Sequence, residues 1–126
     1  MYRCLAIVTA ALVLPASLQA QVKRPFPPTA LRGELVIQAP PEVLLNGEPA
    51  RLSPGARIRG QNNLMEMSAS LVGRKLMVHY TLGTLGLVHD VWILRPEEAQ
   101  VRPWPRTTEE AQRWRFDPAA QTWSKP

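Results

Sequence analysis

Residues 75–94 read KLMVHYTLGTLGLVHDVWIL, and this stretch indicates the fold. Its first half alternates between two sets of side chains, Leu76, Val78, Tyr80 and Leu82 in one set and Met77, His79 and Thr81 in the other. Such alternation is typical of a strand with one buried face, so we expect the first set in a core and the second set outward. The glycines at 83 and 86 predict a turn, and the second half is apolar on both faces. The stretch therefore predicts an antiparallel hairpin.

Shorter alternating segments precede this hairpin. They cover residues 31–39, 43–45, 50–52, 56–59 and 65–71. Asn46-Gly47 predicts a tight hairpin turn, because both residues tolerate positive φ, and Ser53-Pro54-Gly55-Ala56 has the chemistry of a type II turn. Turns at such short intervals are typical of small barrels and sandwiches. We predict an all-β core over residues 31–95, a small barrel or sandwich of five to seven short antiparallel strands.

The C-terminal segment, residues 96–126, differs from the β region. Thr107 followed by Glu110 fits a capping box, which predicts one short helix over residues 108–114. The residues on either side of 118–121 are expected to pair as a second hairpin. We predict that this helix and tail pack on the β domain or flank it.

Three tryptophans recur in the C-terminal segment, at Trp104, Trp114 and Trp123. Their rings could stack on sugars or peptides, or anchor a partner protein. Alternatively, they seal one open end of the β domain, since each buried ring removes much apolar area from water. We favour the structural role, because so polar a tail otherwise has little reason to fold back.

Composition excludes several classes of protein. The chain has 126 residues, of which 45% are hydrophobic and 20% charged, a balance typical of one globular domain. A single cysteine excludes a disulfide scaffold, and thirteen prolines without a glycine period exclude a collagen-like chain. The net charge of +5 comes mainly from arginine and indicates a tendency to associate with anions.

The first 20 residues predict a Sec-type signal peptide. Arg3 precedes an apolar run from Leu5 to Leu14, and Ala20 ends a small-residue cleavage site. The run is about half as long as a membrane span requires. Cleavage would remove the only cysteine and leave a protein without a membrane span, in the periplasm or secreted. Residues 21–30 are rich in proline and are expected to form an extended lead-in.

His79 and His89 are the only histidines, and the predicted hairpin places them on neighbouring strands. Pairing of Gly83 with Gly86 would set His79 opposite Asp90, whereas a shift of one residue would set it opposite His89. Either register offers two ligands to a divalent metal, but zinc needs three or four protein ligands. We therefore favour a solvated His79 over a metal site formed by His79, His89 and Asp90.

Arg57 and Arg59 share the outward face of one predicted strand, and Arg74 lies in a turn. Small barrels bind polyanions through such faces when aromatic rings stack beside the charges. Here the nearest tryptophan, Trp92, lies on another predicted strand, so the stacking platform is missing. These arginines offer an alternative function, the binding of anionic components of the cell envelope. We expect no nucleic acid partner, because export removes most nucleic acid from reach.

Enzyme motifs are absent from the sequence. It contains no Gly-x-Ser-x-Gly, no glycine-rich phosphate loop and no His-Glu-x-x-His. The acidic residues of the predicted strands form no pair whose spacing indicates a shared site. We predict a protein that is not an enzyme and needs no cofactor.

Four segments of the β region resemble a group of small exported proteins of β-proteobacteria. They are Gly33–Pro41, Leu45–Gly47, Leu52–Arg59 and Gly86–Leu94. The resemblance covers residues 30–95 and implies a Gram-negative periplasmic setting. It brings no activity or catalytic residue with it, and the turns and strand ends that carry it are those that a fold requires.

These observations favour a non-enzymatic binding module of the cell envelope. We expect its contact surface on the outward face of the predicted hairpin, with Met77, His79 and Thr81. The tryptophans of the C-terminal segment, with Trp104 first among them, are expected to extend this surface. The expected partner is an envelope protein. The alternatives are a binder of anionic envelope components through the three arginines named above, and a periplasmic protein that binds a divalent metal.

Overall fold

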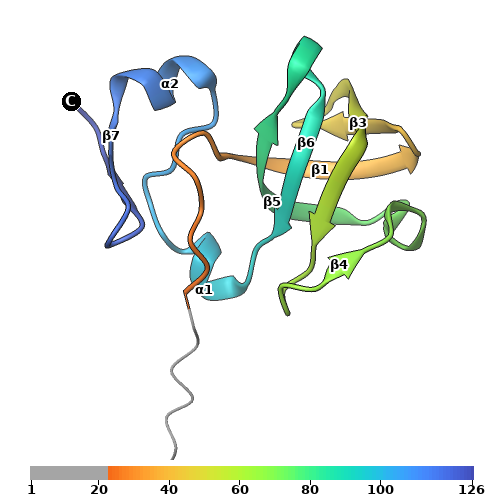
Figure 1. The fold of residues 1–126 in the computed structure, drawn as a ribbon, viewed down its shortest axis with the longest axis horizontal. Helices are drawn as coiled ribbons and strands as arrows, with labels where there is room; N and C mark the ends of the chain where they lie inside the picture. Colours follow the sequence, from red (N-terminus) through yellow and green to blue (C-terminus); the bar gives the residue numbers. More distant parts are fainter. Residues whose placement is uncertain (1–22) are drawn as a thin grey trace, which may run out of the picture.

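The computed structural model of the protein describes residues 23–126 (Figure 1). The predicted signal peptide lies outside the described residues. The strands are β1 (Leu31–Ala39), β2 (Glu42–Leu45), β3 (Glu48–Arg59), β4 (Met65–Glu66), β5 (Lys75–Leu82), β6 (Val88–Ile93), β7 (Arg115–Asp117) and β8 (Thr122–Ser124). The helices are the 3-10 turns η1 (Ser68–Leu71) and η2 (Thr84–Gly86) and the short α1 (Pro96–Ala99) and α2 (Thr108–Arg113). The predicted all-β core is confirmed.

Five of these strands close into a barrel. Their order around the ring is β2-β1-β5-β6-β3, and β3 pairs again with β2 to complete it. The first three strands are neighbours, and the chain then crosses so that β5 lies beside β1, which is a Greek-key connection. Small five-stranded Greek-key barrels include the OB-fold, an architecture that serves many functions and by itself implies none. Closure of the ring decides between the predicted barrel and sandwich in favour of the barrel.

One pairing in the ring is parallel. β6 runs antiparallel to β5 and fills the space between β5 and β3, where it runs parallel to β3. The prediction of antiparallel strands is therefore wrong for this pair. The cause is the crossover, which places β5 beside β1 and leaves β6 to run in the direction of β3.

Several local sequence signals are confirmed. Asn46 and Gly47 have positive φ of 54° and 80° and join β2 to β3. Thr107 caps α2, since its side-chain oxygen accepts a hydrogen bond from the backbone N–H of Glu110, and β7 pairs with β8 as expected. The sequence did not predict α1, which begins at Pro96. Among residues 23–126, no helix has the length and apolar character that crossing a membrane requires.

The predicted turn at residues 53–56 is wrong. These residues lie inside β3, which runs for 12 residues. The pairing of β3 with β6 is interrupted between Leu52 and Arg57. Proline cannot donate a ladder hydrogen bond, and the interruption leaves Pro54 where no donor is required. Closure of the barrel therefore overrides the local turn chemistry.

The predicted strand over residues 65–71 is also wrong. Only Met65 and Glu66 are in a strand, and η1 follows. Leu71 enters the core of the barrel, whereas Met65 and Met67 are exposed. The alternation of residues 65–71 does not indicate a strand here, because these apolar side chains do not share a face. The chain turns into η1, and of these side chains only that of Leu71 points into the core.

The interior of the barrel, which we call the barrel core, is filled by apolar side chains. Leu76, Val78 and Tyr80 of β5 lie in it, as predicted. Leu82 does not, because it stands at the end of the strand with 44% of its area exposed. The other members come from the four remaining ring strands and η1, and they are Leu31, Leu35, Ile37, Val43, Leu52, Ile58, Leu71, Val88 and Val91.

A second core lies outside the barrel, and we call it the aromatic core. Its buried members are Phe26, Ala30, Trp92, Leu94, Trp104 and Trp123. In Figure 1 the lead-in, drawn in orange, runs between the barrel and the C-terminal segment, drawn in blue. β6 sends Val88 and Val91 into the barrel core and Trp92 into the aromatic core, which explains why its sequence is apolar on both faces. Trp104 and Trp123 thus have a structural role, on the outward face of the sheet rather than at an open end.

Candidate functional site

His79 lies on the outward face of β5, as predicted, but it is buried, with 1% of its area exposed. Trp104 stacks on its ring at a centroid distance of 4.0 Å, and Phe26 meets the ring edge-on at 4.4 Å. The expectation of a solvated His79 is therefore wrong, because the lead-in and the C-terminal segment cover this face of the strand. Thr81 on the same face is also buried, while Met77 is exposed.

The His79 ring is neutral. Nε and Nη2 of Arg32 donate to Nε2 of His79 at 3.3 and 3.1 Å. Burial, followed by the positive charges of Arg32 and Arg24, lowers the pKa of His79 to about 2. Because Nε2 accepts hydrogen bonds from a guanidinium, which can only donate, the ring proton is assigned to Nδ1. This Nδ1 has no hydrogen-bond partner among residues 23–126.

Arg32 uses all five of its side-chain N–H groups inside the protein. Besides bonding His79, it donates to the backbone carbonyls of Glu98, Ala99 and Val101. Its Cζ lies 5.5 Å from the ring centroid of Trp104. The pKa of Arg32 is lowered to about 10, first by burial and then by the charges of Arg102 and Arg106. It stays charged at neutral pH and places a fixed positive charge beneath the surface.

Arg32 lies at the base of a groove of about 1110 Å³, which we call the tryptophan groove. Its cationic lining residues are Arg32, Arg102, Arg106 and Lys125, and Glu110 is the one acid in the described lining. Its large apolar lining residues are Met77, Trp104, Trp114 and Trp123. The indole Nε1 of Trp123 is buried and has no hydrogen-bond partner in the described part of the chain.

The positive charge of the tryptophan groove is not neutralised by ion pairs. Within the described residues, neither ion pair includes a cation of the groove. Arg102 and Arg106 are exposed, and their charges repel that of Arg32. Nζ of Lys125 lies 5.3 Å from the ring centroid of Trp114. Guanidinium groups present planar sets of donors that match phosphate and carboxylate, so the groove has the chemistry to hold an anion.

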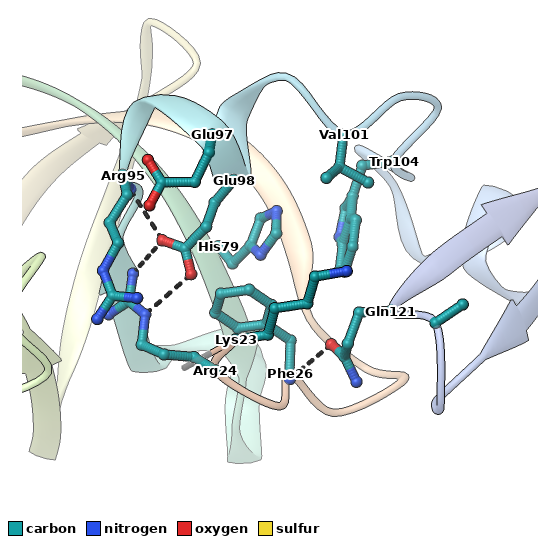
Figure 2. A pocket seen from close by; sticks show the side chains of 11 residues that line it. Lys23, Arg24, Phe26, His79, Arg95, Glu97, Glu98, Val101, Trp104 and Gln121 are labelled. Atoms are coloured by element: carbon teal, nitrogen blue, oxygen red, sulfur yellow. Dashed lines mark hydrogen bonds and ion pairs between the residues drawn. The ribbon is translucent and has the colours of Figure 1, made fainter. Parts of the chain in front are cut away.

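Trp104 also lines a second cavity, of about 420 Å³, which we call the histidine pocket (Figure 2). Figure 2 shows His79 between Glu98 and Trp104, with Phe26 next to it. Val101 and Ala120 complete the apolar lining, and the other lining residues are Lys23, Arg24, Arg95, Glu97 and Gln121. The two cavities therefore share a wall that is formed by a single buried tryptophan.

Arg24 and Glu98 form a buried ion pair beside the histidine pocket. Nε of Arg24 donates to one carboxylate oxygen of Glu98 at 3.0 Å, and Nη2 donates to the other. Arg24 also donates to the backbone carbonyls of Gly60 and Ile93 at 2.9 and 2.8 Å. The pair fastens the lead-in to α1 and the barrel, and its two charges neutralise each other.

The arginines singled out from the sequence lie elsewhere. Arg57 and Arg59 border a different cavity together with Trp92, and Arg74 lies in the turn before β5, outside that lining. Cζ of Arg59 is 5.6 Å from the ring centroid of Trp92, so the predicted lack of an aromatic neighbour is wrong. Asp90 lies 3.6 Å from Arg59 and already provides an anionic partner. This cavity is therefore less suited to an anion than the tryptophan groove.

The candidate metal ligands are not brought together. His79 pairs with Trp92, which makes both predicted registers wrong, because η2 lengthens the turn and the end of β5 is irregular. Nδ1 of His89 lies 2.8 Å from Oγ of Ser53, and Asp90 is in the ion pair described above. Residues 23–126 contain no group of three metal-ligating side chains.

Sequence reasoning overlooked Arg32, Arg102 and Arg106 as a set. Two of them had a local signal, because Arg102-Pro103-Trp104-Pro105-Arg106 places arginines on both sides of a tryptophan between prolines. A residue before proline is driven toward extended backbone, which presents such side chains outside a helix. Arg32 had no comparable signal, since its burial depends on the C-terminal segment that covers it.

Comparisons with protein-family models, with curated proteins and with solved structures found no match. The class of the protein is therefore defined by its own fold and site, a small Greek-key barrel with an aromatic core and a cationic, tryptophan-lined groove.

Proposed function

We propose that the protein is a binding module for an anionic ligand, which it holds in the tryptophan groove. The observation that supports this most directly is the convergence of Arg102, Arg106 and Lys125 above the buried charge of Arg32. Three separate segments of the chain supply these cations, so their proximity is a product of the fold. Like charges gathered in one place repel one another, and a bound anion would relieve that repulsion.

The four cations have different roles in this proposal. Arg102 and Arg106 are exposed and present their guanidinium groups to the anion, where each can donate two parallel hydrogen bonds. Arg32 has no N–H group left to offer and contributes its charge from below. Lys125 stands over Trp114 and adds an ammonium group directly after β8.

The size and apolar lining of the groove favour a ligand with a ring. Small-molecule sites commonly have volumes of about 300–1000 Å³, and the groove, at about 1110 Å³, is too large for a bare inorganic anion. The half-buried ring of Trp114 and the side chain of Met77 line it beside the charges. We therefore infer a sugar that carries phosphate or carboxylate, because tryptophan rings and arginine forks recognise the two parts of such a ligand.

We further propose that this binding takes place in the cell envelope, where the predicted signal peptide would deliver the chain. The predicted protein-binding surface on the outward face of β5 loses support, because His79 and Thr81 are buried there. Met77, which is exposed, lines the tryptophan groove instead. An acidic peptide is the competing occupant of the groove, and the experiment below separates it from a sugar.

Binding is proposed rather than catalysis because of the titratable groups in the groove. They are three arginines, one lysine and Glu110, so the carboxylate has no second acid or imidazole beside it in the described lining. General acid–base catalysis needs such a group near its working pKa and within hydrogen-bond reach of the substrate.

The proposal is tested with the chain from residue 21, free of any tag, by following its tryptophan fluorescence during titration. Glucose 6-phosphate and glucuronic acid are expected to produce saturable changes, whereas glucose is expected to produce none. The affinity should fall as salt is added, because exposed charges are screened. If an acidic peptide binds and both sugars fail, the occupant is a protein segment; if all three fail, the proposal is overturned.

A matched pair of variants locates the site. Arg102→Ala with Arg106→Ala should weaken binding of glucose 6-phosphate at least about tenfold, since a hydrogen bond to a charged group is worth about 1.5–3 kcal/mol. Arg113→Ala with Arg115→Ala removes the same charge from exposed positions outside the groove and should leave the affinity within about twofold. Equal losses in the two variants would show that binding follows net charge alone.

A further inference from the structure

The histidine pocket differs from the tryptophan groove in charge and in enclosure. Its volume is about 420 Å³, within the range of small-molecule sites. The lead-in, β5, α1, the segment after α1 and the β7–β8 turn all contribute to its lining. Arg24 and Glu98, which border it, are occupied with each other. The pocket therefore offers much less net charge than the groove.

The apolar wall of the pocket is planar and aromatic. Phe26 and Trp104 contact each other edge-to-face with their centroids 5.8 Å apart, and the His79 ring lies against both of them. Val101 and Ala120 add aliphatic surface without polar side-chain atoms. Aromatic walls favour flat, apolar ligands, which gain both from burial and from ring contacts.

One polar group in this wall has no acceptor. The two bonds that Arg32 donates to Nε2 of His79 leave the proton on Nδ1, and no residue of 23–126 accepts it. Buried side-chain donors in proteins are nearly always paired. His79 is 99% buried, and the surrounding rings hold it in place, so this donor is fixed in orientation before any ligand arrives.

We infer that the histidine pocket is a second ligand site, which takes an uncharged planar molecule that has a carbonyl acceptor for the Nδ1–H of His79. The ring of the ligand packs on Phe26 and Trp104, and its carbonyl oxygen accepts the hydrogen bond. The donor is paired and the apolar wall is covered in the same step. This site does not depend on the anion proposed for the tryptophan groove.

Benzamide and toluene are suitable probes, because both are planar rings and only benzamide carries a carbonyl. With ¹⁵N-labelled protein, benzamide is expected to shift the Nδ1 resonance of His79 in a saturable manner. Toluene is expected to bind without that shift or to bind more weakly. If benzamide leaves the resonance unchanged up to its solubility limit, the inference is overturned and His79 is only a packed core residue.

Variants at the edge of the pocket test the position of the site without disturbing the core. Ala119 and Ala120 are both exposed in the β7–β8 turn, but only Ala120 lines the pocket. Ala120→Trp should reduce the affinity for benzamide at least tenfold, and Ala119→Trp should leave it unchanged. Benzamide binding that is the same in the two variants would contradict the inference.

Two further variants separate this site from the groove and test the hydrogen bond. The paired Arg102→Ala and Arg106→Ala substitutions should not alter benzamide binding, so failure of either site can be recognised by itself. His79→Phe keeps a ring but removes the donor, and it should abolish the preference for benzamide over toluene. If His79→Phe does not fold, the two alanine-to-tryptophan variants still decide the inference.

Discussion

The barrel core and the aromatic core are built in different ways. The barrel core is formed by hydrogen-bonded strands and one 3-10 turn, and its buried cluster is apolar apart from the Tyr80 hydroxyl. The aromatic core joins the lead-in, β6 and the C-terminal segment, and Arg24, Arg32 and His79 are buried beside it. Buried charges and unpaired donors oppose folding. The barrel therefore supplies the stable frame. Both cavities lie beside the aromatic core, where polar groups are buried although they would be better solvated in water.

The largest loss of stability is expected for Trp104→Ala, because this substitution would open the aromatic core. Trp104 stacks on His79, and its Nε1 donates to the carbonyl of Ala30 at 2.9 Å. Truncation of a buried tryptophan costs about 3–5 kcal/mol, and we expect this fall in the free energy of unfolding in urea.

The matched control is Trp114→Ala, because this ring is only half-buried. It should lower the free energy of unfolding by less than half as much. If the two variants lose the same stability, the aromatic core is not a packed core but a covering on the surface of the barrel. The distinction drawn above between two cores would then be wrong.

The next largest effect is the dependence of the free energy of unfolding on pH, which His79 should cause. The unfolded chain gains a proton on His79 as the pH falls through about 6.5, whereas the folded protein keeps the ring neutral down to about 2. The unfolded state then binds more protons, so the stability present above pH 6.5 is lost as the pH falls. Each pH unit below about 6.5 is worth roughly 1.4 kcal/mol, so the protein should lose about 3 kcal/mol of stability between pH 7.5 and pH 4.5.

His79→Gln is the reference for this measurement, because glutamine can accept the Arg32 hydrogen bonds and does not titrate. The original protein should lose about 3 kcal/mol more than this variant over that pH interval in urea unfolding. Parallel pH profiles for the two proteins would mean that His79 becomes protonated within the folded state.

The smallest change in the free energy of unfolding is expected when an exposed apolar residue on the surface of the barrel is substituted. Met67 is 76% exposed, so Met67→Ser should change the free energy of unfolding by no more than about 0.5 kcal/mol. Leu71, four residues later, is buried in the barrel core, and Leu71→Ala should cost about 2–5 kcal/mol. A large loss in the Met67 variant would show that this segment packs against something in solution.

The sequence was a reliable guide where local chemistry and burial agree. The alternation of residues 75–80 and the Asn46-Gly47 turn depend on neighbouring residues, and both are confirmed. Residues 53–56 carry equally good turn chemistry, yet they continue β3, because the barrel needs one long strand to pair with β2, β4 and β6. The structure of residues 53–56 is determined by pairing with strands that are distant in the sequence, and no local sequence pattern indicates that pairing.

The candidate site was much less predictable than the fold. The tryptophan groove collects residues from β1, β5, the segment 102–106, α2 and the end of the chain. Their meeting depends on how the C-terminal segment docks on the barrel, which alternation and turn chemistry do not specify. The same limit applies to His79, because the sequence predicted the strand face on which it lies but did not predict that it is buried.

The position of the two cavities has a practical consequence for protein engineering. Lys23, the first described residue, lines the histidine pocket, and Lys125, one residue before the last, lines the tryptophan groove. An affinity tag or a surface tether fused directly before Lys23 or after Lys125 would stand beside a cavity and compete with the ligand proposed for it. The η2 turn borders neither cavity, and Leu85 at its tip is 91% exposed. A fluorophore or an immobilising group attached at that internal turn would leave both cavities free.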